Sequence, residues 1–286
     1  MIKPRKFLLK CSAGNPHLNK QFDQGLVASL PWYDHAITQP ALDRFWYAMA
    51  QFLKAQGCRQ VPADLQRRVD ARSLWQSPRL MLSQCCGPDL FTTEGADLRV
   101  IGRPVFADLD CQQGYYHSHI VACKPELHSP VRVAVNSLSS RSGYLALLEW
   151  AQAHDVSIAS VQVSGSHLNS LQLLTRGQAD IAAIDAHLIN QYQLTIDLPI
   201  VGTSQAAPAP PFVCHRDCCL NNNDFDSDSL DQELLFAALK QAIATCGSGI
   251  GIVDIIKTQR TDYQHMRSPP AVCDVIEENA SATGRR

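Results

Sequence analysis

Hydroxyl side chains gather in one short segment, residues 136–144, which reads Asn-Ser-Leu-Ser-Ser-Arg-Ser-Gly-Tyr. The residues before it, 131–135, alternate in hydrophobicity and are rich in valine, which predicts a strand. The residues after it, 145–154, carry leucine and tryptophan in a stretch that favours a helix. Four serines therefore stand between the end of a strand and the start of a helix: Ser137, Ser139, Ser140 and Ser142.

A serine at a helix start has two uses that the sequence alone does not separate. Its oxygen caps a free backbone N–H group. The same N–H groups, with the positive end of the helix dipole, form a site for an anion. Hydroxyl and N–H donors in one place suit a tetrahedral oxyanion such as phosphate, phosphonate or sulfate. The plain alternative is a well-capped helix with spare loop serines.

Polar turns follow other expected strands in the same way. They contain Pro31, then Ser83 and Gln84, then residues 164–167, and finally Asp185. Strands alternate with helices along the chain, which predicts an α/β protein with largely parallel sheets. In such sheets ligands bind beyond the carboxyl ends of the strands. The turns are therefore expected to converge on one binding site.

The periodicity predicts eight strands and six helices. The strands are expected at residues 26–30, 79–83, 98–106, 116–123, 131–135, 157–163, 180–185 and 199–203. The helices are expected at residues 40–56, 65–74, 145–154, 168–176, 187–192 and 230–245. The prolines at 208–211 are expected to break the chain, and the tail from residue 277 is expected to be disordered.

Composition narrows the functional classes. The 286 residues carry a formal net charge of −2 and no basic stripe with interleaved aromatics, so we expect no nucleic-acid partner. Near the N-terminus only residues 7–9 are apolar in a row, which is too short for a signal peptide, and no 18-residue apolar run predicts a membrane span. With eleven cysteines and no signal, we expect a cytoplasmic protein with reduced thiols, or a periplasmic one if the start site is misassigned.

The same turns resemble the substrate-binding proteins of phosphate, phosphite and phosphonate ABC transporters. The similarity lies in the order and spacing of short motifs over about residues 26–215. The motifs are Ala28-Ser-Leu-Pro-Trp-Tyr33, Leu82-Ser-Gln-Cys-Cys-Gly87, Gly102-Arg-Pro-Val-Phe106, Tyr116-His-Ser118, Val133-Ala-Val-Asn136, Ser140-Arg-Ser-Gly-Tyr144, Ser164-Gly-Ser-His167, Ala182-Ala-Ile-Asp185, Gly202-Thr203 and Ala207-Pro-Ala-Pro-Pro211.

This resemblance implies a two-lobed type 2 periplasmic-binding-protein fold with the ligand in the cleft between the lobes. Lobe one would take residues 1–107 and 203–286, and lobe two would take residues 108–202. The function implied is binding of a small oxyanion, without catalysis, cofactor or metal. The implied partners are the oxyanion and an ABC transporter permease, and we expect a monomer.

The resemblance also implies which residues bind the ligand. Ser140 and Ser142 match the serines that hold the oxyanion at the helix start. Tyr33 matches an aromatic hydroxyl that faces the cleft, and His167 matches a histidine in a lobe-two turn. Asp185 matches a carboxylate that meets a cationic substituent or a protonated ligand oxygen. The predicted set is completed by Ser83 and Gln84 on the facing lobe and by Tyr116.

Each of these roles has a structural alternative. His167 is also consistent with a purely structural turn residue, Asp185 with a helix cap, and Tyr33 with a core aromatic. Arg141 stands where the family pattern leads us to expect an uncharged residue, and we expect it to point to solvent rather than to the anion. Lobe two thus has one residue that departs from the pattern at the expected site.

The sequence gives weaker support to other functional classes. The run Cys214-His-Arg-Asp-Cys-Cys219 has zinc-ligand letters, but a tetrahedral site would need residues such as Cys111, His117 and His119 to join it by folding. A hydrolase would be expected to show a Gly-x-Ser-x-Gly elbow, which the sequence lacks. A cytoplasmic enzyme or a ligand sensor on the same fold stays open, because a fold does not fix a function.

Overall fold

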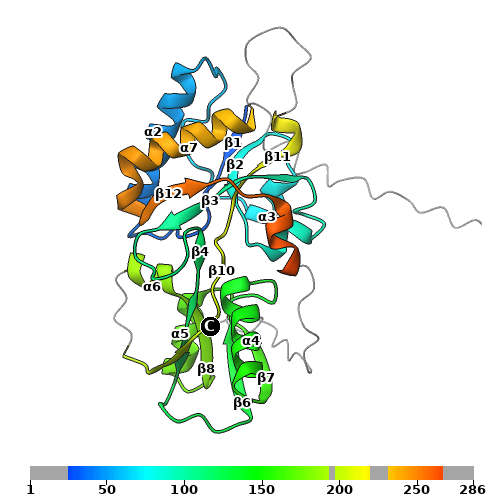
Figure 1. Ribbon diagram of the computed structural model, residues 1–286, viewed down its shortest axis with the longest axis vertical. Coiled ribbons are helices and arrows are strands. Elements are labelled where there is room, and N and C mark those ends of the chain that lie inside the picture. The colour runs from blue at the N-terminus through cyan, green and yellow to red at the C-terminus, as the bar shows by residue number, and fades with distance from the viewer. Residues whose placement is uncertain (1–24, 193–196, 220–230, 267–286) are drawn as a thin grey trace, which may run out of the picture.

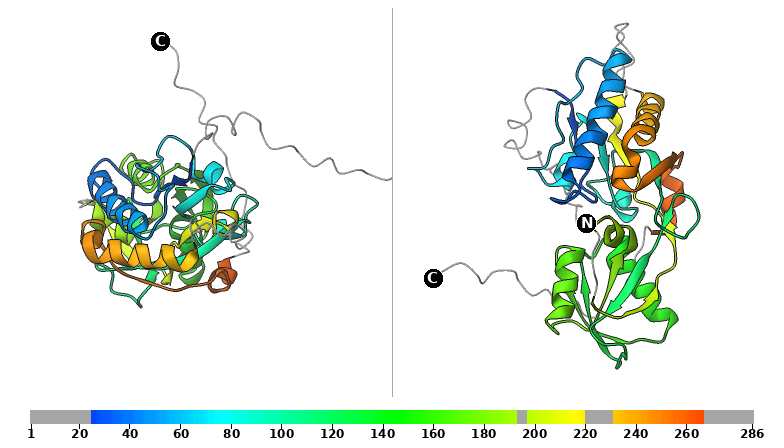
Figure 2. Two further views of the ribbon diagram at one scale, coloured as in Figure 1. Left: turned by 90° about the horizontal axis from the view of Figure 1, so that it is seen from above. Right: turned by 90° about the vertical axis from the view of Figure 1, so that its left-hand side faces the viewer.

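The computed structural model describes residues 25–192, 197–219 and 231–266. Two lobes, each built on a five-stranded mixed sheet, stack along the long axis of the molecule (Figures 1 and 2). We call them lobe one and lobe two after the order in which the chain enters them. This is the α/β architecture that the sequence predicts.

Lobe one contains the strand order β1-β2-β11-β3-β12. Its elements are β1 (Val27–Ala28), α2 (Gln39–Ala55), α3 (Ala71–Trp75), β2 (Leu80–Gln84), η2 (Pro88–Phe91), β3 (Leu98–Phe106), β11 (Phe212–His215), η4 (Arg216–Cys219), α7 (Gln232–Cys246), η5 (Gly247–Ile250), β12 (Ile252–Ile256) and η6 (Arg260–Met266). Helices α2 and α7 lie side by side against the sheet (Figure 1). They pack there because α2 buries one apolar stripe, which includes Leu42, Phe45 and Met49.

Lobe two contains the strand order β7-β6-β8-β5-β9. Its elements are β5 (Ser118–Ala122), β6 (Val131–Val135), η3 (Arg141–Leu145), α4 (Ala146–Ala153), β7 (Ile158–Val163), α5 (His167–Thr175), β8 (Ile181–Asp185), α6 (Ala186–Gln191) and β9 (Ile200–Thr203). Alternate residues of β8 belong to different cores: Ile181 and Ala183 pack with α4, and Ala182 and Ile184 pack with α5. Because successive side chains of a strand point to opposite faces, β8 packs against a helix on each face of the sheet.

The chain crosses between the lobes along β4 (Tyr115–Tyr116) and β10 (Ala207–Pro208), which pair antiparallel (Figure 1). The expected strand at residues 116–123 is therefore divided at residue 117, with β4 in the crossing and β5 in lobe two. The predicted domain boundaries, after residues 107 and 202, stay a prediction. Strand β9 runs across the second of them.

The expectation of largely parallel sheets is wrong. Among the described residues, only β1–β2, β6–β7 and β6–β8 pair in parallel. The other pairs within the two sheets are antiparallel, among them β2–β11, β3–β11, β3–β12, β5–β8 and β5–β9. Each crossing returns the chain to a sheet in the opposite direction, so the returning strands insert beside strands of the other sense. Hydrophobic periodicity carries no information about this direction.

Three strands, β10, β11 and β12, were not predicted from the sequence. β11 starts directly after the prolines at 208–211, which predict a break in the chain. It is nevertheless buried throughout, because it lies between β2 and β3 in the middle of the lobe-one sheet. The short helix expected at residues 65–74 is found as α3, Ala71–Trp75.

The packing of β9 on α4 gives a testable prediction, because Gly202 leaves no room for a side chain. A Cβ built there lies 2.6 Å from Nε1 of Trp150, whose ring is held in the lobe-two core. We expect Gly202→Ala to lower the free energy of unfolding by about 1–3 kcal/mol, as overpacking does. Thermal or denaturant unfolding measures this.

The matched control is Gly249→Ala, where the nearest atom to the added Cβ is Ala41 Cβ at an ordinary 3.4 Å. This variant should unfold close to the wild type. Equal stability of the two variants would contradict the packing of β9 on Trp150.

Candidate functional site

A cleft of about 520 Å³ lies between the two lobes. It is lined where strands end: the turn after β1, the turn after β2, the serine segment after β6, the turn before α5 and the start of α6. Its lining residues are Pro31, Trp32, Tyr33, Asp34, Asp70, Ala71, Arg72, Trp75, Cys86, Asp89, Asn136, Ser137, Ser139, Ser140, Ser142, Gly165, Ser166, His167, Asp185, Leu188 and Tyr192. The cleft therefore lies at the carboxyl ends of β1, β2, β6, β7 and β8, where α/β folds bind ligands.

Ser140 is the N-cap of the helical stretch that follows β6. Its Oγ accepts a hydrogen bond of 3.0 Å from the backbone N–H of Gly143, and a π-helical turn, η3, leads directly into α4. The capping alternative and the cleft position are both correct for this residue. A hydroxyl that accepts one hydrogen bond still has its own proton to donate, so Ser140 can cap the helix and contact an anion together.

Ser142 and His167 form a pair in the cleft wall. Ser142 Oγ lies 3.0 Å from His167 Nε2. Burial lowers the pKa of His167 to about 4, so its ring is neutral near pH 7. His167 begins helix α5, whose N-cap is Ser166. The structure thus brings three predicted site residues, Ser140, Ser142 and His167, to the same wall of lobe two.

Tyr33 and Asp185 join the two lobes across the cleft. The hydroxyl of Tyr33 donates to Oδ2 of Asp185 over 3.0 Å, while Oδ1 accepts from the backbone N–H groups of His187 and Leu188. Asp185 is therefore both a helix cap and a cleft residue. Burial raises the pKa of its carboxyl group, and the hydroxyl and N–H donors partly offset this rise.

The backbone of Tyr33 is unusual, since its φ is +65°. This left-handed conformation is uncommon for an aromatic residue, and Thr38 holds it by donating from Oγ1 to the Tyr33 carbonyl. Burial and the neighbouring Asp185 raise the pKa of Tyr33 well above its usual value, so the hydroxyl keeps the proton that it donates. The strained turn thus aims a donor at Asp185.

A second bridge between the lobes was not predicted. Arg72 donates from Nη2 to Asp89 Oδ1 in its own lobe over 3.0 Å and to Ser139 Oγ in lobe two. Asp89 also accepts from the backbone N–H of Cys86. Sequence reasoning missed Arg72 and Asp89 because they come from a short helix and a 3-10 turn that carry no motif. Asp70, the N-cap of α3, is the nearest signal in the sequence.

The expectation for Arg141 is wrong. Its residue is only 5% exposed, and its guanidinium pairs with Glu149, with Nη2 to Oε2 at 2.7 Å. Its backbone N–H donates to Cys86 Sγ at 3.4 Å, which makes a third contact between the lobes. Burial raises the pKa of Cys86 to about 12, so this cleft thiol is protonated and a poor nucleophile.

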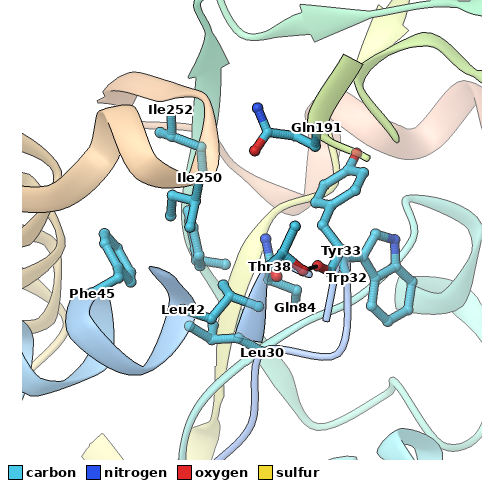
Figure 3. A pocket seen from close by; sticks show the side chains of 11 residues that line it. Leu30, Trp32, Tyr33, Thr38, Leu42, Phe45, Gln84, Gln191, Ile250 and Ile252 are labelled. Atoms are coloured by element: carbon cyan, nitrogen blue, oxygen red, sulfur yellow. Dashed lines mark hydrogen bonds between the residues drawn. The ribbon is translucent and has the colours of Figure 1, made fainter. Parts of the chain in front are cut away.

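Ser83, Gln84 and Tyr116 do not line the cleft. Every residue of β2 is buried, and Ser83 Oγ accepts from Trp75 Nε1 over 3.3 Å behind the cleft wall. Gln84 lines a second, small apolar pocket, which lobe one forms together with Gln191 of α6 (Figure 3). Strand β2 lies between β1 and β11, and its side chains are buried on both faces of the sheet.

Tyr116 takes a supporting position. It is 2% exposed, in the crossing strand β4. Burial raises its pKa well above the usual value, next to Cys86 and Ser142. It therefore lies behind the serine wall rather than in it.

No metal site is formed by the residues that the structure describes, since no three His, Cys, Asp or Glu side chains gather there. Cys214 lies in the buried strand β11, in lobe one, while the rings of His117 and His119 meet edge to face at the lobe-two end of the crossing. The metal prediction for the whole chain stays a prediction. Within the described ranges, none of the helices has the length and hydrophobicity needed to cross a bilayer.

Part of the chain matches a known protein family. Residues 128–256 match the family model described as "ABC transporter, phosphonate, periplasmic substrate-binding protein". A comparison with curated proteins found no match.

Solved structures share the fold at low sequence identity. PhnD1 from Prochlorococcus marinus, in complex with methylphosphonate, is 19% identical, with a TM-score of 0.61 over 85% of this chain and 95% of that one. XAC2383 from Xanthomonas citri, bound to ATP, is 14% identical, with a TM-score of 0.59 over 86% of this chain and 99% of that one. The phosphonate-transporter binding protein PA3383 from Pseudomonas aeruginosa is 16% identical, with a TM-score of 0.58 over 86% and 85%.

The chain therefore has the two-lobed type 2 periplasmic-binding-protein fold, and its match over residues 128–256 confirms the resemblance to phosphonate-binding substrate-binding proteins of ABC transporters.

Proposed function

We propose that this chain is a solute-binding protein for a small phosphorus oxyanion (phosphate, phosphite or a phosphonate) that serves an ABC transporter. The observation that carries the proposal is the serine wall at the start of the η3–α4 helical stretch, which opens into a cleft bridged by residues of both lobes. The match to the phosphonate-binding family supports it.

The anion would bind at residues 136–142. The positive end of the helix dipole and the hydroxyls of Ser140 and Ser142 favour negative charge there. When the Nε2 of His167 carries the ring proton, it donates to Ser142 Oγ and leaves the serine proton for the ligand. His167 then donates to Ser142, and Ser142 donates to the oxyanion.

The carboxylates of the cleft suit a different part of the ligand. Asp34, Asp70 and Asp89 line the cleft from lobe one, and Asp185 lines it from lobe two. Carboxylates repel a bare anion, but they accept hydrogen bonds from a protonated oxygen or a cationic substituent. We therefore infer a ligand that presents its anionic oxygens to lobe two and a donor to the carboxylates.

The site favours binding over turnover. A serine next to a histidine suggests a nucleophile and its base, but a histidine with a pKa of about 4 is a weak base at neutral pH. The partner of a catalytic histidine would be a carboxylate on the other ring nitrogen, and no carboxylate of the described residues pairs with His167. The enzyme alternative has no such observation in its favour.

The partner and location follow from the same proposal. A substrate-binding protein delivers its ligand to a permease, and the matched family is described as periplasmic. The expectation of a cytoplasmic protein stays a prediction, because residues 1–24 lie outside the described part of the chain. Cell fractionation of the native host would decide between the two compartments.

A ligand screen tests the proposal. Phosphate, phosphite, methylphosphonate and aminoethylphosphonate are each added in a thermal-shift assay, with sulfate and small sulfonates beside them. A bound oxyanion at a hundred times its dissociation constant should stabilise the fold by about 2.7 kcal/mol. If no anion shifts the wild-type melting temperature and none co-purifies, the oxyanion proposal fails.

Serine variants then test the site itself. Hydrogen bonds to a charged group contribute about 1.5–3 kcal/mol, so Ser140→Ala and Ser142→Ala should each weaken binding of the best ligand by about ten- to a hundredfold. Calorimetry measures this. Ser140→Ala should also destabilise the unliganded protein, by about 1 kcal/mol, because Ser140 caps the helix.

Ser166→Ala is the matched control, since it removes the cap of α5, where Ser166 Oγ accepts from Asn169. It should lower stability in the same way as Ser140→Ala, with a smaller loss of affinity. Unchanged affinity in both Ser140→Ala and Ser142→Ala would place the ligand elsewhere.

The depressed pKa of His167 predicts a pH dependence of stability. In the folded state the ring titrates at about pH 4, whereas an exposed histidine titrates at about 6.5. Between these values the unfolded chain binds a proton that the folded chain does not, so stability is complete above about pH 6.5 and falls as the pH drops toward 4. His167→Asn should remove about 3 kcal/mol of this dependence.

The measurement is denaturant unfolding across that pH range, as the difference between wild type and variant. His128→Asn removes an exposed histidine from the same lobe and should leave the pH dependence nearly unchanged. Parallel curves for wild type and His167→Asn would show that His167 is not buried as a neutral ring.

A further inference from the structure

One buried charge in lobe two has no role in the site described so far. Arg141 is the first residue of the η3–α4 helical stretch, directly between Ser140 and Ser142, and its backbone N–H faces lobe one at Cys86. Its side chain is 6% exposed. The side chain extends along the helix toward Glu149, which lies two turns further on. The guanidinium therefore lies behind the serine wall rather than in the cleft.

The hydrogen bonding of this guanidinium is incomplete. Nη2 binds Glu149, but Nε and Nη1 are buried and have no hydrogen-bond partner within the described ranges. Burial of a guanidinium without full pairing lowers stability. A neutral residue at this position would avoid that cost, so the charge calls for a functional reason.

The counter-charge does not cancel the field in the cleft. Glu149 has a side chain that is 41% exposed, whereas that of Arg141 is 6% exposed. Water screens the carboxylate more strongly than the buried guanidinium. On the buried side of the helix, toward the serines, the pair therefore acts as a net positive charge. The pKa of Tyr116 agrees, because the charge of Arg141 partly offsets its rise.

The cleft needs such a source of positive potential. Four carboxylates line it, and Arg72 is the one lysine or arginine among the lining residues of the described chain. Arg72 is already paired with Asp89. The serine wall itself supplies hydrogen-bond donors and the helix dipole, but no full positive charge to offset the four carboxylates.

We propose that Arg141 is a specificity-determining residue, whose buried charge acts through the helix start and raises the affinity of the serine site for doubly charged oxyanions over singly charged ones. This inference rests on the proposed function and goes one step beyond it. Coulomb energy is proportional to the charge of the ligand, so the effect on a dianion is twice the effect on a monoanion. The geometry makes Glu149 the residue that moderates it.

The experiment compares methylphosphonate at alkaline pH, where it is a dianion, with methanesulfonate, a monoanion of the same shape. Calorimetry gives both affinities for the wild type and for Arg141→Gln. We expect Arg141→Gln to weaken methylphosphonate by about tenfold and methanesulfonate by about threefold, which is half the effect in free energy. Arg141→Lys should keep most of the preference, because it keeps the charge.

A second variant predicts the opposite sign. Glu149→Gln removes an exposed carboxylate and unmasks the guanidinium, so it should tighten methylphosphonate by about two- to threefold and methanesulfonate by less. A purely structural role for the ion pair would make both variants weaken binding. This variant also keeps the test informative if Arg141→Gln folds poorly, which a thermal melt would show.

The matched control is Arg132→Gln. Arg132 also belongs to lobe two and pairs with a carboxylate, Asp180, at 2.6 Å, but its side chain is 48% exposed and it lies near the start of β6, away from the cleft. The same change in net charge there should leave both affinities within about twofold of wild type.

The outcomes separate this inference from the proposed function. Equal losses for both ligands in Arg141→Gln, or a loss in Glu149→Gln, would overturn the role of Arg141 while the oxyanion site stands. Losses in Arg132→Gln as large as those in Arg141→Gln would also overturn it, because net charge alone would then explain them. If the wild type binds neither these ligands nor phosphate, the proposed function fails and the inference fails with it.

Discussion

A buried carboxylate must find hydrogen-bond donors on every side, and Asp185 finds them in both lobes. Two backbone N–H groups at the start of α6 hold one oxygen, and the hydroxyl of Tyr33 from lobe one holds the other. Without Tyr33, that oxygen would be left unsatisfied at a cost of about 1–3 kcal/mol. The positive φ of Tyr33 is the backbone strain that brings the hydroxyl there. One contact between the lobes thus depends on a donor placed by a strained turn, and the contacts of Arg72 with Ser139 and of Arg141 with Cys86 add to it.

The serine segment shows how one short sequence serves folding and binding at once. Ser140 closes the helix start, and Ser142 reaches His167 in the next turn of the same lobe. Both hydroxyls keep a proton for an external acceptor in the arrangement described above. The helix therefore does not have to lose its cap when an anion arrives. A preformed site of this kind loses little conformational entropy on binding, which favours affinity.

Much of this arrangement could be predicted from local sequence. The strand at residues 131–135, the serine turn and the following helix each have a local signal, and α/β topology places their ends at the cleft. What could not be predicted depends on distant contacts. The sequence position of Arg141 predicts a surface residue, yet its side chain is buried and pairs with Glu149. Arg72 approaches Ser139 only because two lobes close on each other, and β11 is recognisable only from its place between β2 and β3. Residues that act across the lobes carry no periodic signal in either.

The same contacts set limits on how the cleft discriminates among ligands. A site built around an unpaired polar group strongly rejects a ligand that cannot pair with it. Asp185 is not in that position, because Tyr33 satisfies it when no ligand donor is present. A ligand donor at Asp185 replaces a hydrogen bond rather than creating one, so the gain from a protonated oxygen or an ammonium group is smaller than the strength of the new bond. The charge of the ligand does not face this exchange, since the hydroxyls of Ser140 and Ser142 bind a backbone N–H group and a histidine ring in the described residues, and no carboxylate. Selection by charge is therefore expected to outweigh selection by hydrogen-bond donors in this cleft.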